Sequence, residues 1–281
     1  FNQKTTLVSD GPNAKFFSVA TLSPATGDLS STRRVVGDVS ASKEASASMG
    51  RKIAVWKSGV ATVENGADPS GPPITGDAER AAFDAHTGEA VSCCGESYDN
   101  KAVKHSGLVF KFPFDAQKKT YPFWDTTLLK ALPAHYKRTT TLDGVKVYEY
   151  VQDIARTKSG TTDLPASVVG LPGSATVSGV NYYQNVRTLW VEPETGVIIK
   201  GQEQQSNTIE APGATPLVAT DVTIGYDTKT VKDNADTYGS KGAQLKLVRV
   251  WAPLVAGVLA VLLLIAWVLL QVRGGSGRRR A

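Results

Sequence analysis

The side chains that could carry out chemistry are few and scattered in this sequence. The three histidines are His86, His105 and His135, and none lies in an H-x-H or H-E-x-x-H pattern that would hold a metal ion. The sequence has no G-x-S-x-G nucleophile motif, no Walker-A loop and no G-x-G-x-x-G turn. The carboxylates of Glu192 and Glu194 flank a proline, which is typical of a solvated turn. We therefore predict no catalytic residue, no cofactor and no metal ion.

The two cysteines, Cys93 and Cys94, are adjacent. Two cysteines cannot cross-link a domain of this size, so the protein is not a disulfide-rich scaffold. The pair has three interpretations: a vicinal disulfide, a metal site completed by His86 or His105, or two thiols that are free or placed separately. Metal sites usually separate their cysteines by two to four residues, so the spacing disfavours a metal. The other two interpretations remain open.

Aromatic residues are densest between residues 106 and 125. We expect a strand over residues 106–112, followed by a polar turn and a second aromatic stretch. The aromatic side chains that could act together are Phe110, Phe112, Phe114, Tyr121, Phe123 and Trp124. They have three interpretations: the core of a hairpin, the wall of an apolar groove or tunnel for a lipid-like ligand, or an exposed surface for a partner protein.

A C-terminal stretch over residues 251–272 contains no charged residue and is apolar on all sides. A helix of about 22 residues spans roughly 30 Å of hydrocarbon. Trp251 and Trp267 lie towards its two ends, where indole rings favour the membrane interface. The sequence therefore predicts one transmembrane helix. Ala252, Ala256 and Ala260 recur at every fourth position, so they form a stripe of small residues against which another membrane helix could pack.

The charges flanking this stretch indicate how the chain is oriented. Four arginines (273 and 278–280) follow the helix, and three basic residues (241, 246 and 249) precede it. This bias predicts a cytoplasmic tail over residues 273–281 and an exported domain before the helix. The other 27 basic residues nearly balance 26 acidic ones, so no basic face predicts nucleic-acid binding. Because the chain begins at Phe1, we expect an upstream signal peptide or first membrane helix.

The exported part reads as a mainly β, antiparallel domain over residues 1–227. Strand-forming runs are separated by turn residues, and Asp143-Gly144 and the loop over residues 192–196 predict two hairpins. We expect loops over residues 40–50 and 155–178. Residues 228–250 have a helical composition and predict a stalk, interrupted near Gly239 or Gly242, that leads into the membrane helix.

Several of these segments resemble the actinobacterial porin PorA family. The resemblance is most specific in HSGLVFKFPFDAQKKTYPFWDTTL (105–128), and FDAHTGEAV (83–91), TLDGVKVYEYVQ (141–152) and LWVEPETGVIIKGQEQ (189–204) support it. It implies an exported β-rich domain between two membrane helices, and a pore-forming activity from the family's name. The layout is also similar to that of class B scavenger receptors, whose exported domains contain a lipid tunnel.

Three functions follow for a non-catalytic protein of the cell envelope. Its exported domain binds or conducts lipid-like molecules, as the aromatic segment indicates. Alternatively, the chain is an accessory or structural subunit of a larger membrane complex, with other membrane proteins against its alanine stripe. As a second alternative, it forms a channel. The expected partners are membrane lipids and other membrane helices, including one upstream of Phe1.

Overall fold

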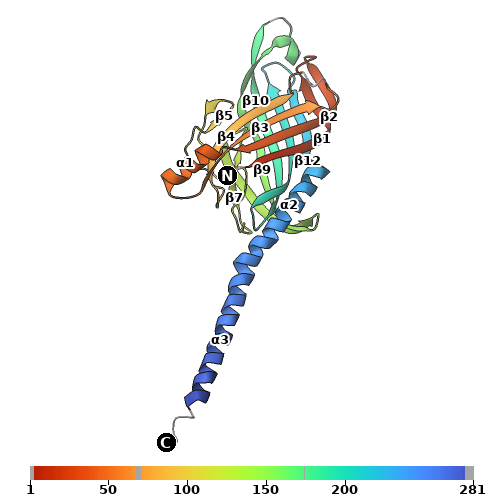
Figure 1. Ribbon diagram of the computed structural model, residues 1–281. Coiled ribbons are helices and arrows are strands. Elements are labelled where there is room, and N and C mark those ends of the chain that lie inside the picture. The colour runs from red at the N-terminus through yellow and green to blue at the C-terminus, as the bar shows by residue number, and fades with distance from the viewer. Residues whose placement is uncertain (1–2, 68–70, 174, 276–281) are drawn as a thin grey trace, which may run out of the picture.

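The computed structural model describes residues 3–67, 71–173 and 175–275. These residues form one twelve-stranded antiparallel sheet followed by a long C-terminal helix, which confirms the predicted mainly β fold (Figure 1). The strands are β1 (Lys4–Ser18), β2 (Ser23–Gly37), β3 (Ile53–Glu64), β4 (Thr75–Asp84), β5 (Ser97–Tyr98), β6 (Lys101–Ala102), β7 (Tyr121–Asp125), β8 (Lys130–Leu142), β9 (Val145–Pro165), β10 (Thr176–Glu192), β11 (Val197–Glu210) and β12 (Leu217–Tyr226). The helices are α1 (Val39–Met49), η1 (Ala166–Val169), α2 (Thr228–Lys246), η2 (Leu247–Trp251) and α3 (Ala252–Gly275).

The sheet curls until its two sides meet. Its strand order is β6-β5-β4-β3-β2-β1-β12-β11-β10-β9-β8-β7. Residues 105–114, here called the closing segment, connect the two sides through Leu108, which bridges Phe123 of β7 and also Glu89. Ala90, which follows Glu89 in the chain, bridges Phe83 of β4. Single bridges therefore close the sheet into a barrel, and the side chains inside it are shielded from solvent.

The closing segment corrects the prediction of a strand over residues 106–112. Gly107 and Phe110 have positive φ angles of 65° and 62°, which a regular strand does not allow. Phe110, Phe112 and Phe114 therefore do not share one side of a strand. The aromatic run instead turns, and its rings point to different places.

Both predicted hairpin turns are confirmed. Leu142 pairs with Val145, and the two residues between them, Asp143 and Gly144, have φ angles of 44° and 79°. Positive φ at both positions is the requirement of a type I′ turn. The second turn, between β10 and β11, also ends in a glycine with positive φ, Gly196.

Two segments predicted as loops are regular structure. Residues 39–49 form α1, because Asp38 accepts a hydrogen bond from the Ala41 amide and Gly50 ends the helix in a left-handed conformation. The small polar composition of this segment hid the helix. Most of residues 155–178 extends β9 and β10 into a long hairpin, whose Thr, Ser and Gly residues carry little apolar alternation.

Helix α2 is continuous, so the predicted interruption near Gly239 or Gly242 is wrong. The two glycines instead allow close packing. A Cβ atom at Gly239 would lie 2.5 Å from Val145, and one at Gly242 would lie 2.6 Å from the Glu192 carboxylate. Val231 and Ala235 pack against the barrel at this end. The barrel end where α2 begins is called the helix end below.

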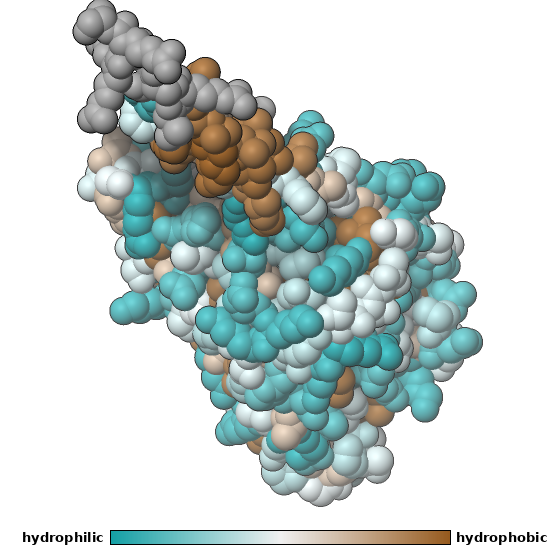
Figure 2. All heavy atoms as spheres, turned by 90° about the horizontal axis from the view of Figure 1, so that it is seen from below, coloured by the Kyte–Doolittle hydropathy of each residue, from teal (hydrophilic) through white to brown (hydrophobic). Residues whose placement is uncertain are grey.

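Helices α2, η2 and α3 run without a break from the barrel (Figure 1). The helix over residues 228–271 is, among the described residues, the one helix long and apolar enough to cross a membrane. Figure 2 views the molecule along this helix and shows apolar side chains gathered on it, while the barrel is largely polar. The tail begins inside α3, and residues 276–281, with Arg278 to Arg280, lie outside the described residues. The domain limits at residues 227, 250 and 272 stay predictions.

The turn between β10 and β11 predicts a sharp difference between two glycine substitutions. A Cβ atom at Gly196 would lie 2.1 Å from the carbonyl oxygen of Phe112, whereas one at Gly144 has no atom within 4 Å. Gly144→Ala therefore suffers only backbone strain, about 1 kcal/mol. Gly196→Ala adds a backbone clash, and we expect it to lower the free energy of unfolding by about 3 kcal/mol or more. Denaturant unfolding of the two variants measures this difference, and equal losses would show that the Phe112 contact is not tight.

Candidate binding cavity

The barrel encloses a cavity of about 500 Å³. Its middle is polar, because several inward-facing strand residues there carry charges or hydroxyl groups. A packed core would have aliphatic residues at these positions. The charged and phenolic residues that line it include Arg33, Asp77, Glu79, Tyr183, Arg187 and Glu203. At the far end, away from α2, a buried apolar cluster with Phe16 adjoins the cavity, and Leu29 and Val222 belong to both the cluster and the lining.

Arg187 on β10 organises one wall of this cavity. Its guanidinium donates hydrogen bonds to Asp125 Oδ2 at 3.1 Å, to Glu203 Oε1 at 2.8 Å and to Gln152 Oε1 at 2.7 Å. Tyr183 also donates to Asp125 Oδ2, at 3.0 Å. Burial alone would raise the pKa of Glu203, but the charge of Arg187 holds that pKa below its usual range. The network joins β7, β9, β10 and β11, and each of its three charged side chains has a partner of opposite charge.

His105 does not line the cavity; it is buried behind Glu79 and Trp124, which do, and it lies between two carboxylates. Its Nδ1 lies 2.9 Å from Glu96 Oε2, and its Nε2 lies 3.3 Å from Glu79 Oε1. The ring also packs against Trp124, at 4.7 Å between centroids. Burial by itself would lower the pKa of His105, but the two carboxylates raise it above its usual value.

A second cavity, of about 700 Å³, lies at the helix end and is here called the mouth. Its walls are mainly apolar and aromatic, and they come from β3, β4, the closing segment and α2. The lining includes Trp56, Phe83, Phe114, Tyr238, Leu245 and Val248. Leu245 and Val248 are exposed side chains on the last turns before α3. The mouth therefore adjoins the base of the candidate membrane helix.

The two cavities adjoin each other. Five residues line both of them: Gln3, Trp56, Lys111, Val197 and Tyr238. Helix α2 lies beside this junction, where Asn234 donates a hydrogen bond to the carbonyl oxygen of Ile199 on β11. Arg249 forms ion pairs with Asp115 at 2.8 Å and Glu194 at 3.3 Å, which join the base of the helix to the barrel. The arrangement is an apolar entrance that leads to a polar interior.

The structure divides the six aromatic residues singled out in the sequence. Phe110, Phe123 and Trp124 line the inner cavity, and Phe114 lines the mouth. Phe112 and Tyr121 line neither cavity; they pack with Tyr150 in the main buried cluster. The segment thus supplies both core and cavity wall, and its role in binding a ligand stays a prediction.

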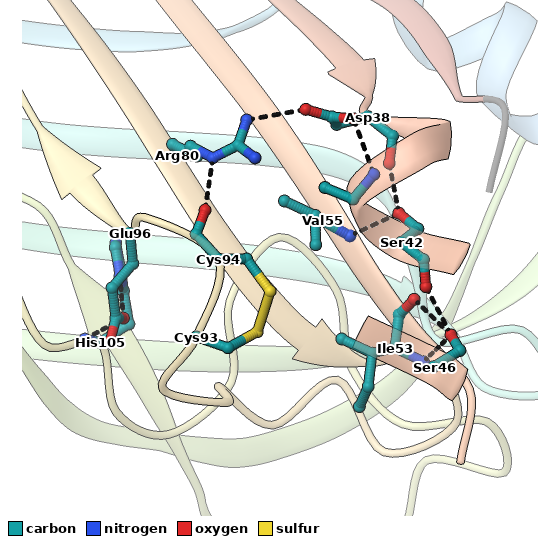
Figure 3. The surroundings of a disulfide bond; sticks show 11 residues. Asp38, Ser42, Ser46, Ile53, Val55, Arg80, Cys93, Cys94, Glu96 and His105 are labelled. Carbon is teal, nitrogen blue, oxygen red and sulfur yellow. Dashed lines mark hydrogen bonds and ion pairs between the residues drawn. A yellow bond between two sulfur atoms is a disulfide. The ribbon is translucent and has the colours of Figure 1, made fainter. Parts of the chain in front are cut away.

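Cys93 and Cys94 form a disulfide in the structure (Figure 3). The pair packs against a cluster with Ala45 of α1, and the Cys94 carbonyl oxygen accepts a hydrogen bond from Arg80 Nε at 2.8 Å. Arg80 also pairs with Asp38, the residue that caps α1. Neither cysteine lines the inner cavity or the mouth, and no group of three metal-ligating side chains occurs in the described part of the chain.

Sequence reasoning missed the interior charges. Arg187 and Asn185 are polar residues on a strand whose side chains alternate between polar and apolar, yet both are buried inside the barrel. Alternation along one strand shows that two faces differ but not which face is enclosed. Ala252, Ala256 and Ala260 lie on α3, which no described residue outside the helix covers, so a packing partner for them stays a prediction.

The outer face of the barrel bears on what the protein can do in a membrane. A membrane-spanning barrel carries a continuous apolar band about 25 Å tall. Among the described strand residues, the large apolar side chains that are clearly exposed are Val36, Val63 and Val218, on three different strands. These three side chains do not form a band, whereas the described part of α3 exposes large apolar side chains along its whole length.

His105 predicts a pH-dependent stability. Its pKa is raised in the folded protein, so the stabilisation is complete below about pH 6.5 and is lost as the pH rises through the folded-state pKa. We expect His105→Gln to lower the free energy of unfolding by about 2 kcal/mol at pH 6 and by less at pH 9. Denaturation followed by near-ultraviolet circular dichroism measures both values.

The matched control for this experiment is His135→Gln. His135 is exposed on β8, and we expect its replacement to change the free energy of unfolding by less than about 0.5 kcal/mol at either pH. A His105→Gln effect that grows between pH 6 and pH 9 would contradict the assignment.

Comparison with known proteins relates this chain to porins of one family. The family model described as Porin PorA matches residues 1–269. Porin PorA of Corynebacterium amycolatum is 35% identical over 123 residues, which cover 35% of this chain and 32% of that protein. Porin PorA of Corynebacterium resistens is 28% identical over 144 residues, which cover 34% and 35%. The chain spans about a third of the length of these curated relatives. Because the family model matches nearly the whole chain, this protein belongs to the porin PorA family.

Proposed function

We propose that this chain is a non-catalytic cell-envelope membrane protein whose barrel binds an amphiphilic, lipid-like molecule. The observation that supports the proposal most strongly is the mouth, an apolar cavity of about 700 Å³ at the base of the candidate membrane helix. A cavity of this size and lining is typical of a site for a small, largely apolar ligand. Membership of a porin family and the apolar helix support a place in the envelope membrane.

The order of the two cavities fits an amphiphile better than a wholly apolar molecule. The mouth is lined by aromatic and aliphatic side chains, whereas the inner cavity carries paired charges such as Arg187 with Glu203. An apolar chain gains free energy by leaving water for the mouth, at about 25 cal/mol for each Å² of surface removed. A polar group would find hydrogen-bonding partners at the junction.

The position of the mouth gives such a ligand a short route from the membrane. Leu245 and Val248 belong to α2 and η2, directly before α3, and their side chains line the mouth. A lipid that leaves the outer surface of the bilayer would meet these residues first. In this proposal the protein lies in the envelope with its barrel outside the membrane and residues 273–281 in the cytoplasm.

Two neighbouring positions on α2 provide a test. Gln244 is exposed and lines the mouth, whereas Ala243 is exposed and lines neither cavity. We expect Gln244→Trp to obstruct the mouth and to lower the bound lipid per protein at least fivefold, while Ala243→Trp leaves it unchanged. Native mass spectrometry of the full chain in mild detergent measures the bound lipid. Wild-type protein that carries no lipid and takes up none when lipid is added would overturn the proposal.

A channel is the second candidate function, and the porin name of the curated relatives favours it. The exposed apolar side chains of the described strands form no band, which disfavours a path formed by these strands through hydrocarbon. A channel would therefore require several α3 helices to assemble, with Ala252, Ala256 and Ala260 at their contacts. It predicts conductance across a planar bilayer that Ala256→Leu abolishes and Val258→Leu preserves. Full-chain protein inserted without any conductance would remove this candidate.

A further inference from the structure

Lys111 is a buried cation without a carboxylate partner in the described residues. It belongs to the closing segment, lines both cavities and is only 8% exposed. Its Nζ donates a hydrogen bond to the carbonyl oxygen of Ala85 at 3.3 Å and lies 3.8 Å from the centre of the Phe114 ring. No described ion pair includes it. Burial lowers the pKa of Lys111 to about 8, so the ammonium form still predominates at neutral pH.

The acid that could neutralise Lys111 is already engaged. Asp84 is the carboxylate whose charge acts on it, but Asp84 Oδ2 accepts a hydrogen bond from Arg51 at 3.0 Å. Asp84 Oδ1 accepts from the amides of His86 and Thr87, at 2.8 and 3.0 Å. Asp84 therefore holds the turn after β4, and Lys111 keeps a net positive charge in an apolar wall.

The mouth as a whole has the same sign of charge. Its lining contains three lysines, Lys52, Lys111 and Lys241, and no acidic residue. The inner cavity differs, because its arginines face Asp77, Glu79 and Glu203. The lysines of the lining thus lie at the entrance, where the walls beside Lys111 are aromatic.

We propose that the mouth selects an anionic lipid of the adjoining membrane and that Lys111 contacts the anionic oxygen of its head group. This inference rests on the proposed function and names the class of its ligand. A long-chain lipid with one phosphate fits both features of the mouth, since an oxygen of the phosphate would pair with Lys111 and the chains would lie against Trp56, Phe83 and Phe114. Leu245 and Val248 place this site beside the base of α3, where head groups of the bilayer lie.

The test compares lipids that differ only in head-group charge. Full-chain protein, delipidated in a non-ionic detergent, is titrated with phosphatidylglycerol or with phosphatidylcholine of the same acyl chains, and native mass spectrometry gives the affinities. We expect tighter binding of phosphatidylglycerol by the wild type. Lys111→Met should weaken that binding about ten- to a hundredfold, the loss expected for a charge-assisted hydrogen bond, and should leave phosphatidylcholine binding nearly unchanged.

Two controls separate charge selection from folding. Lys158→Met removes an exposed lysine near the far end of β9 and should preserve both affinities. Lys111→Met removes an unpaired buried charge, so it should unfold at the same temperature as the wild type or higher. A variant that keeps its circular dichroism spectrum and loses the preference for phosphatidylglycerol supports the proposal.

Other outcomes overturn it in distinguishable ways. Equal binding of the two lipids by the wild type would overturn the selection of anions and leave the proposed function intact. A preference that survives Lys111→Met would overturn the role of Lys111. If inorganic phosphate displaced phosphatidylglycerol at equal concentration, a free anion rather than a lipid would be the occupant. Binding of neither lipid would overturn this inference together with the proposed function.

Discussion

The closure of the sheet by residues 105–114 is the constraint on which the rest of the structure depends. Twelve strands curl until their sides face each other, but β4 and β7 are joined by single bridges through residues 89–90 and Leu108 rather than by a ladder. An irregular closing segment can turn its side chains into the core, into the inner cavity and into the mouth, which a regular strand with a two-residue period cannot do. The barrel thereby gains a wall and keeps an opening.

The same constraint explains where charge is buried. Because the interior is only partly filled, it retains polar side chains, and each buried charge needs a partner in place. Arg187 finds Asp125 and Glu203, and His105 finds Glu79 and Glu96. Lys111 differs because it lies on the closing segment at the entrance, where the acid of the neighbouring turn is already hydrogen-bonded to Arg51 and to backbone amides.

Helix α2 completes the site by linking it to the candidate membrane span. Its glycines at 239 and 242 let it pack closely on the turns of the barrel, and Arg249 pairs with Asp115 and Glu194 at the base of the helix. The mouth is thus held at a defined place relative to α3, and any ligand that enters it does so beside that helix.

Much of this architecture could be predicted from the sequence, and the failures have physical causes. The apolar C-terminal helix and the Asp143-Gly144 turn depend on local signals, length and backbone preference, and both predictions were right. The closing segment was predicted as a strand because its aromatic residues favour strands, whereas its conformation depends on contacts with Phe123 and Gly196, distant in sequence. Arg187 could not be placed inside the barrel, since closure of the sheet is a property of all twelve strands together.

The most direct measurement of the central claim is the position of a bound lipid on the protein. The full chain can be incubated in a bilayer with a phospholipid that carries a photoreactive group near the start of its acyl chain, irradiated, digested and analysed by mass spectrometry. The account predicts cross-links to the walls of the mouth, at Phe114, Leu245 and Val248, in addition to those expected along the span. Cross-links confined to residues 251–271, with none on the barrel, would contradict it.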